Sequence, residues 1–180
     1  MRLMKYSIVL LSLLAFSTSQ AQKIPKWKIT DVENLVANGD GIQVINFWAT
    51  FCKPCVAEIP DFIRISKKYA KEKVRLQLVS IDLPASYPAK IAAFAKKSNF
   101  NTNIAWLNET NADYFCPKVS PKWSGAIPAT LIVNHRTGYR KFFEDPLSGA
   151  DFEKELKLAI DDWNASTDHS IELKQHPNKH

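Results

Sequence analysis

Runs of apolar and β-branched residues recur along the chain between turn-forming residues, which is the pattern of buried strands. These runs lie at residues 42–48, 74–82, 104–108, 129–134 and 139–144. The turn sequence HRTG separates the last two, so we predict that they form a hairpin. Residues 23–29 are predicted to form a short extended lead-in.

Apolar residues at helical spacing fill the intervals between these runs. The helices predicted from this spacing cover residues 30–38, 52–71, 87–99 and 148–163. The first has Thr30 at the expected cap and Glu33 at the capping-box position. Residues 112–128 contain three prolines and are predicted to be irregular.

The order of these elements predicts the fold class. Strands and helices alternate first, and a hairpin and a closing helix follow, which favours an α/β fold with a mixed central sheet and helices on both faces. The 180 residues, 46% hydrophobic and 23% charged, have the size and composition of one globular domain. We place this domain at residues 22–163 and a polar, flexible tail at 164–180.

The first 21 residues have a different character. A basic start with Arg2 and Lys5 precedes an apolar run from Tyr6 to Phe16 and then small polar residues, which is the layout of a secretory signal peptide cleaved after Ala21. The run has about half of the ~20 residues that a membrane-spanning helix needs, so a retained N-terminal anchor is the weaker alternative. We therefore expect an exported, periplasmic protein.

Charge excludes one class of partner. Removing the signal peptide lowers the formal charge from +6 to +4, and the remaining basic residues are scattered. The lysine-rich stretch at 64–75 is typical of the solvated face of a helix. Basic and aromatic residues do not interleave, so we expect no nucleic-acid partner.

Two of the three cysteines, Cys52 and Cys55, stand at the expected start of the second helix. Unpaired N–H groups and the helix dipole there lower the pKa of a thiol, and Lys53 adds a nearby positive charge. Pro54 suits a first helical turn. Cys55 lies one turn further in, where it can reach the sulfur of Cys52. This pattern is typical of a thiol–disulfide exchange centre.

Other uses of this cysteine pair are weaker alternatives. A plain disulfide staple would close a loop too small to stabilise the fold much. A metal site needs four ligands, which Cys116 and His135 would have to complete. Haem attachment is excluded, since Val56 stands where a histidine would have to follow Cys55.

The segment VINFWATFCKPCVAEIP, residues 44–60, resembles the active-site segment of the thioredoxin superfamily. More narrowly, it resembles the exported TlpA/ResA-like branch, whose pattern is filled here from Asn46 to Pro60. The segment GAIPATLIVN, residues 125–134, resembles the cis-proline segment of the same family. The resemblance covers about residues 27–163 and implies a thioredoxin fold and thiol–disulfide oxidoreductase activity. We expect no cofactor.

The resemblance also implies roles for individual residues. Cys52 would attack a substrate disulfide, and Cys55 would resolve the mixed disulfide. The substrate would bind around this pair, at Ile127, Pro128, Trp48 and Pro54. Trp48 is also suited to packing beneath the site.

Asn46 stands where cytosolic thioredoxins usually carry a buried aspartate, and an asparagine cannot accept the proton of Cys55. Glu58 lies one helical turn after Cys55 and is the candidate for that role. Burial beside sulfur would raise its pKa towards neutrality. The alternative is a surface glutamate that is favoured by the helix dipole.

Cys116 precedes Pro117 in the segment that leads to the cis-proline strand, and we expect it on the same face as Cys52. It is a half-buried thiol that acts as a small hydrophobic residue, a third redox thiol, or an attachment point for a partner.

The predicted function is that of an exported oxidoreductase which reduces protein disulfides and is recharged by a membrane-bound electron donor. Cytochrome c maturation is one process that such an enzyme could serve. The alternatives are an oxidant that installs disulfides, a metal carrier, and a non-catalytic docking module on the same fold.

Overall fold

The computed structural model describes the backbone of residues 23–175 and the side chains of residues 23–166. The predicted signal peptide, residues 1–21, lies outside the described residues, as does the end of the predicted tail, residues 176–180. No helix within the described part of the chain combines the length and the apolar character that crossing a membrane requires.

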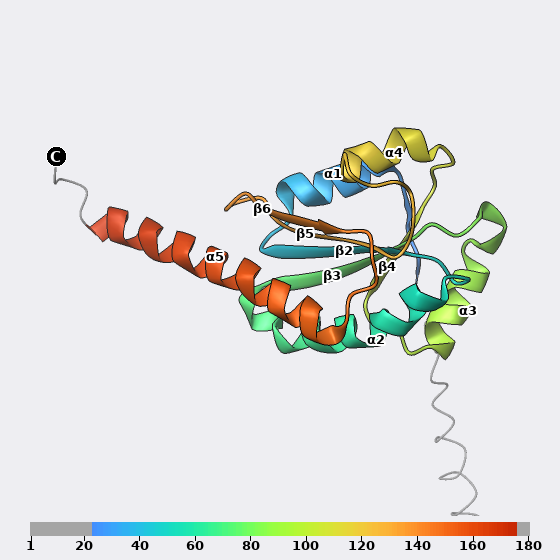
Figure 1. The fold of residues 1–180 in the computed structure, drawn as a ribbon, viewed down its shortest axis with the longest axis horizontal. Helices are drawn as coiled ribbons and strands as arrows, with labels where there is room; N and C mark the ends of the chain where they lie inside the picture. The colour runs from blue at the N-terminus through green and yellow to red at the C-terminus, as the bar shows by residue number, and fades with distance from the viewer. Residues whose placement is uncertain (1–22, 176–180) are drawn as a thin grey trace, which may run out of the picture.

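A single mixed sheet forms the centre of the molecule (Figure 1). Its strands are β1 (Lys26–Trp27), β2 (Ile42–Trp48), β3 (Val74–Ser80), β4 (Asn103–Leu107), β5 (Ala129–Asn134) and β6 (Tyr139–Phe143). They lie in the order β1-β4-β3-β2-β5-β6. The first four strands are parallel to one another, β5 is antiparallel to β2, and β6 is antiparallel to β5. The predicted strands and the hairpin are confirmed.

Helices cover both faces of this sheet, as predicted (Figure 1). The α-helices are α1 (Ile29–Asn38), α2 (Lys53–Lys68), α3 (Ala89–Lys97), α4 (Ala112–Val119) and α5 (Gly149–Gln175). Single 3₁₀ turns follow α2 and precede α3, at η2 (Ala70–Glu72) and η3 (Pro84–Ser86). Helices α1 and α4 pack on one face, and α2, α3 and α5 contribute to the core on the other.

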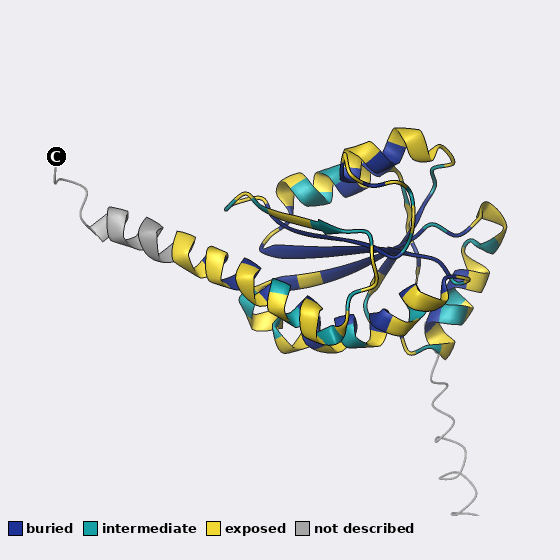
Figure 2. Ribbon diagram, in the orientation of Figure 1, coloured by how far each residue is buried: buried dark blue, intermediate teal, exposed yellow. Residues whose placement is uncertain are grey.

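The core consists of two hydrophobic clusters, one on each face of the sheet: the α1–α4 cluster, with residues of α1 and α4, and the α2–α5 cluster, with residues of α2, α3 and α5. The central strands between them are largely buried (Figure 2). Successive side chains of a strand point to opposite faces, so Phe47 enters the α1–α4 cluster and Trp48 enters the α2–α5 cluster. Phe62 of α2 stacks on Phe152 of α5 with ring centroids 4.0 Å apart. Because β2 is buried on both faces, its sequence is apolar apart from Gln43 and Asn46.

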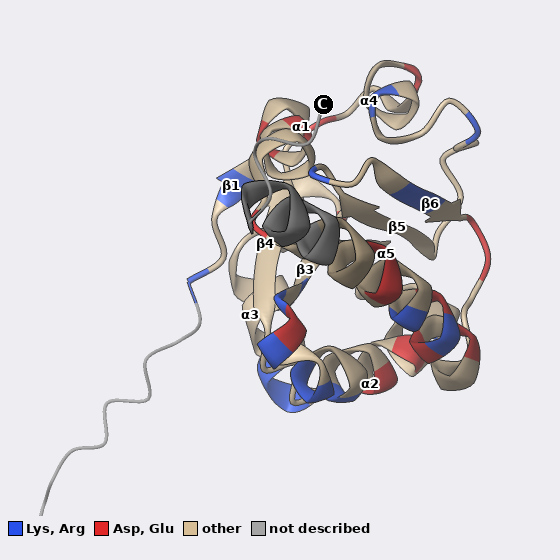
Figure 3. Cartoon of the chain, turned by 90° about the vertical axis from the view of Figure 1, so that its left-hand side faces the viewer, with Lys and Arg blue, Asp and Glu red and all other residues tan. Residues whose placement is uncertain are grey.

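Basic and acidic residues are mixed along α2 and α5 (Figure 3). Three basic residues of the stretch 64–75 pair with carboxylates: Arg64 with Asp61, Lys68 with Glu153, and Lys73 with Asp40. These ion pairs agree with the prediction that the stretch 64–75 forms the solvated face of a helix.

The prediction of an irregular segment at 112–128 is wrong in its first half, which forms α4. Phe115, Cys116 and Val119 lie on one side of this helix and are buried. Pro117 is tolerated because the helix ends two residues later, so few helical hydrogen bonds depend on it.

Two helix ends also differ from the predictions. Helix α1 begins at Ile29 with Lys28 as its N-cap, not Thr30, because the Asp31 carboxylate accepts a hydrogen bond from the Lys28 N–H at 2.7 Å. Helix α5 continues past Trp163 to Gln175, into the predicted tail. No glycine or proline interrupts residues 164–175, so nothing in the sequence breaks the helix there.

Candidate active site

Cys52 and Cys55 form a disulfide at the end of the sheet where β2 leads into α2. Cys52 is the N-cap of α2, and the N–H of Cys55 donates to its sulfur at 3.3 Å. Cys52 retains 8% of its surface, whereas Cys55 is fully buried. Cys52 is therefore the more accessible residue of the pair.

The segment before Pro128 lies directly against this sulfur. The Ile127–Pro128 peptide bond is cis, and the Ile127 carbonyl oxygen lies 3.8 Å from Cys52 Sγ. Ile127 is half-buried and Pro128 is buried. The carbonyl of the half-buried Ile127 thus lies beside Cys52.

Glu144 holds the segment that leads to this cis bond. Its Oε1 accepts hydrogen bonds from the Ser124 N–H at 2.9 Å, the Ala126 N–H at 3.1 Å and the Ser124 hydroxyl. The pKa of Glu144 is lowered, chiefly by the Ser124 hydroxyl. Trp123 Nε1 donates to the Ala126 carbonyl at 2.8 Å. Sequence reasoning did not find Glu144, because its partners lie about twenty residues away along the chain.

Glu58 is buried, with 6% of its surface exposed, so the alternative of a surface glutamate is wrong. Its Oε1 accepts from Asn46 Nδ2 and its Oε2 from the Leu147 N–H, each at 2.9 Å. Burial raises its pKa to about 6, although both hydrogen bonds oppose this shift. A carboxyl group of this kind can exchange a proton near neutral pH.

A second buried carboxylate, Asp82, fixes the turn before Cys52. It accepts hydrogen bonds from the Thr50 N–H at 3.1 Å, the Thr50 hydroxyl at 2.5 Å and the Ser80 hydroxyl at 2.8 Å. Trp106 Nε1 donates to the Asp82 carbonyl at 2.7 Å. The sequence analysis places Asp82 only at the end of a strand, because its partner Thr50 lies 32 residues away along the chain.

Two exposed apolar side chains lie next to residues of the site in the sequence. Phe51 precedes Cys52 and is 68% exposed, and Leu83 follows Asp82 and is 72% exposed. Trp48, in contrast, is fully buried against the rings of Phe94 and Phe100. Direct substrate contact by Trp48 is therefore corrected to packing beneath the site.

A groove of about 400 Å³ lies beside the first turns of α2. It is lined by Pro54, Ala57, Glu58, Asp61 and residues 146–149. Pro54 and Ala57 are exposed at its rim, so the groove connects the Glu58 carboxyl with solvent.

Comparisons with known proteins agree with this geometry. The model of the AhpC/TSA family matches residues 17–138, a segment that contains both cysteines and the cis-proline. The chain belongs to the AhpC/TSA family. The thioredoxin-like protein YneN of Bacillus subtilis is 36% identical over 116 residues, which cover 64% of this chain and 63% of YneN. The thiol-disulfide oxidoreductase ResA of Geobacillus thermodenitrificans is 22% identical over 119 residues, covering 66% of this chain and 63% of ResA. The chain thus spans less than two thirds of the length of these relatives.

Solved structures show the same fold. A thiol:disulfide interchange protein from Chlorobium tepidum superposes with a TM-score of 0.54 at 20% identity, over 67% of this chain and 80% of that one. A thioredoxin-related protein from Neisseria meningitidis serogroup B has a TM-score of 0.54 at 24% identity, over 67% and 82%. This AhpC/TSA family member therefore has the thioredoxin fold that the sequence predicted.

Cys116 does not join the site of this family member. It lies on α4, buried in the α1–α4 cluster, whereas Cys52 and Cys55 belong to the α2–α5 cluster. The expectation that it shares a face with Cys52 is wrong, because the segment folds as a helix over the other layer. Burial raises the pKa of its thiol to about 11, and the charges of Glu144 and Asp113 add to this. Such a thiol stays protonated and unreactive.

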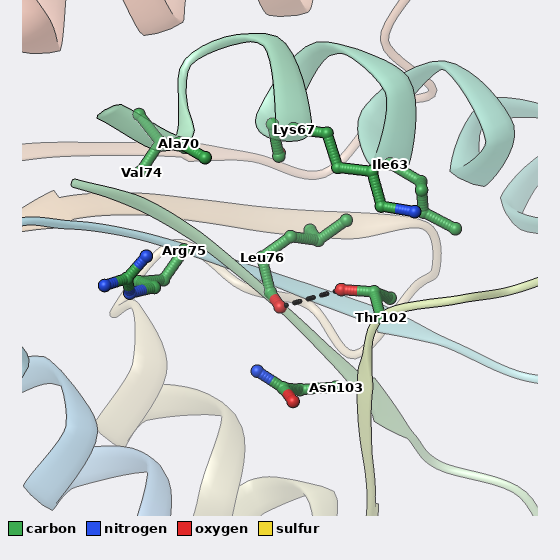
Figure 4. A pocket seen from close by; sticks show the side chains of 9 residues that line it. Ile63, Lys67, Ala70, Val74, Arg75, Leu76, Thr102 and Asn103 are labelled. Atoms are coloured by element: carbon green, nitrogen blue, oxygen red, sulfur yellow. Dashed lines mark hydrogen bonds between the residues drawn. The ribbon is translucent and has the colours of Figure 1, made fainter. Parts of the chain in front are cut away.

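Another hollow, of about 160 Å³, lies at the opposite end of the sheet, beside the start of β3 (Figure 4). Lys67 lies over it, and the Thr102 hydroxyl donates to the Leu76 carbonyl at its floor. None of the residues that line it belongs to the redox site. Among the side chains that the structure describes, residues 23–166, no group of three or more histidine, cysteine or acidic residues could hold a metal ion.

Proposed function

We propose that this chain is an exported thiol–disulfide oxidoreductase that reduces disulfides in other proteins. The observation that carries the proposal is the unequal exposure of the pair: an accessible Cys52 at a helix N-terminus, a buried Cys55 behind it, and the Ile127 carbonyl beside them. Two Geobacillus relatives bear the name thiol-disulfide oxidoreductase ResA, which supports it.

The reaction begins from the reduced pair. The Cys52 thiolate attacks one sulfur of the substrate disulfide, so a Cys52–substrate bond forms and the second substrate sulfur leaves as a thiolate. Cys55 then attacks Cys52, which releases the first substrate sulfur and forms the Cys52–Cys55 disulfide. Two electrons pass to the substrate, whose sulfurs take up two protons.

Each side chain has a task in these steps. The N-terminus of α2 and Lys53 stabilise the Cys52 thiolate. Cys55 is fully buried, so it reacts with Cys52 alone. Glu58 accepts the Cys55 proton when the mixed disulfide is resolved and passes it to water in the adjacent groove.

The proposed substrate is an extended protein segment. The Ile127 carbonyl offers a backbone acceptor to it, and Pro128 and Pro54 give the surface a fixed shape. Phe51 and Leu83 extend the surface with exposed apolar side chains, which suits a partner that presents apolar residues around its cysteines.

Export completes the proposal. The signal peptide would deliver the protein to the periplasm, where disulfides persist. The oxidised pair then needs a membrane-bound electron donor, and cytochrome c maturation is a process in which a reductant of this kind would serve.

The test combines an insulin-reduction assay with the midpoint potential of the Cys52–Cys55 couple. We expect insulin reduction that Cys52→Ser abolishes and that Cys116→Ser, the matched control, leaves within about twofold. A potential near −270 mV, as in thioredoxin, supports a reductant. A potential of about −120 mV would make the protein an oxidant. Absence of a reversible couple would remove the enzymatic proposal and favour a docking module or a metal carrier.

A further inference from the structure

A row of three buried polar side chains runs from the redox helix to the cis-proline strand. Glu58 lies on α2, Asn46 on β2 and Thr130 on β5, and all three are buried. Asn46 Nδ2 donates to Glu58 Oε1 at 2.9 Å and to Thr130 Oγ1 at 3.0 Å. Asn46 and Thr130 are direct partners in the antiparallel pairing of β2 with β5. The amide of Asn46 is thus the link between the two other side chains.

This amide has one unused atom. Asn46 Oδ1 is buried and has no hydrogen-bond partner among the described residues. Both N–H groups of the amide, in contrast, point at acceptors. The arrangement fits an ionised Glu58, because a carboxylate only accepts hydrogen bonds and the amide nitrogen only donates them.

A proton on Glu58 reverses this requirement. The neutral carboxyl carries an O–H that needs an acceptor, and the Leu147 N–H at its other oxygen cannot serve as one. A half-turn of the Asn46 amide brings the unused Oδ1 towards Glu58. The same half-turn presents Oδ1 to Thr130, whose hydroxyl can change from acceptor to donor. The unpaired atom of the amide is then Nδ2 instead of Oδ1.

We propose that Asn46 is a positioning residue whose amide rotates with the protonation of Glu58 and transmits that change to Thr130 on the cis-proline strand. The functional meaning of this coupling rests on the proposed function. Thr130 lies two residues after Pro128. The hydrogen bonding of the strand that binds substrate therefore changes when Glu58 gains or loses a proton. Asn46 and Thr130 are fully buried, so water cannot replace a hydrogen bond that is lost between them, and the two side chains change together.

The titration of Glu58 can be distinguished from that of the other charged groups near it. Asp61, one turn further along α2, pairs with Arg64 at 2.7 Å. Lys53 is exposed at the start of the helix, and the two cysteines do not titrate as a disulfide. The segment 146–149 on the far side of the groove contributes no ionisable side chain to its lining. Glu144, which binds the segment before the cis bond, has a lowered pKa and therefore titrates below Glu58. In the oxidised protein, a titration seen on β5 can therefore be assigned by its midpoint and by single substitutions.

The test is an NMR pH titration of the oxidised protein. We expect the backbone amides of Ala129 and Thr130 to shift with the midpoint of the Glu58 carboxyl signal, which burial places at about 6. Asn46→Leu and Thr130→Val should each reduce the amplitude of this shift on β5 by about threefold or more, while the Glu58 signal still titrates. Glu58→Gln should abolish both signals.

The controls decide the remaining cases. Asp61→Asn should leave the shift on β5 unchanged. If Asn46→Leu does not fold, Thr130→Val decides alone, because it keeps Asn46 and nearly the same volume. The proposal is overturned if the wild-type strand does not follow Glu58, or if the shift keeps its full amplitude in Thr130→Val. Insulin reduction is measured separately, so an inactive protein with an intact shift would contradict the proposed function and not this inference.

Discussion

The buried carboxyl of Glu58 should make the oxidised protein less stable as the pH rises from about 4.5 to about 6. Folding raises the pKa of Glu58 from 4.5 to about 6. A tenfold change in proton affinity corresponds to about 1.4 kcal/mol, so this group changes the free energy of unfolding by about 2 kcal/mol. The contribution is fully present below pH 4.5, where both states hold the proton. It is lost as the pH rises through 6, because the folded protein then contains a buried carboxylate.

Glu58→Gln removes this titration and nearly conserves the side-chain volume. Urea denaturation of both oxidised proteins, followed by tryptophan fluorescence from about pH 4 to pH 7, gives the two free energies of unfolding. The free energy of the variant minus that of the wild type should increase by about 2 kcal/mol over this range. The loss of one hydrogen bond to Leu147 adds an offset that does not depend on pH. A difference that stays constant within about 0.5 kcal/mol would refute the raised pKa of Glu58.

Three further predictions concern the rest of the molecule. With a thiol pKa of about 11, Cys116 should react with iodoacetamide about a hundredfold more slowly than an exposed cysteine at neutral pH; rapid labelling of the native protein, seen by mass spectrometry, would contradict its burial. Phe152→Ala removes the ring stacked on Phe62 and should lower the free energy of unfolding by ~3–5 kcal/mol in urea denaturation, and a loss below about 1 kcal/mol would show that α5 is not held there. The hydrogen bond from Lys68 is the main reason that the pKa of Glu153 is lowered to about 2, so the stability that this pair contributes is present above pH 4.5 and is lost as the pH falls towards 2. Glu153→Gln should therefore make acid unfolding less steep by circular dichroism, and an unchanged acid transition would count against the pair.

The parts of the fold that could be predicted are those in which local pattern and tertiary structure agree. The run from Ile42 to Trp48 is apolar except at Gln43 and Asn46, and all seven residues are buried because both faces of β2 are covered. Its mostly apolar character is visible without a structure. Helix α4 could not be predicted in the same way. Its proline content argues against a helix, and only the packing of Phe115 and Cys116 against the α1 layer favours one.

The same division holds for the site. Cys52, Cys55 and Glu58 lie within two turns of one helix, so their spacing alone indicates that they act together. Asp82 and Glu144 carry no local sign of their roles, because each acts on a segment that is distant in sequence. Hydrogen bonds of this kind depend on the completed tertiary structure, which periodicity does not encode.

The central place of β2 in the sheet also sets the order in which the site is built during folding. β2 pairs with β3 across a short connection, whereas its other partner, β5, lies far along the chain; Asn46 and Thr130 are 84 residues apart. Closing a longer loop costs more chain entropy, so the β2–α2–β3 unit is expected to form before β5 docks. At that stage both cysteines are in place, but the Ile127 carbonyl is not yet beside them. A change that weakens the docking of β5 should therefore leave the Cys52–Cys55 pair in place but displace the Ile127 carbonyl from it. Under the proposed function, such a protein would still react with small disulfides but would no longer select protein substrates.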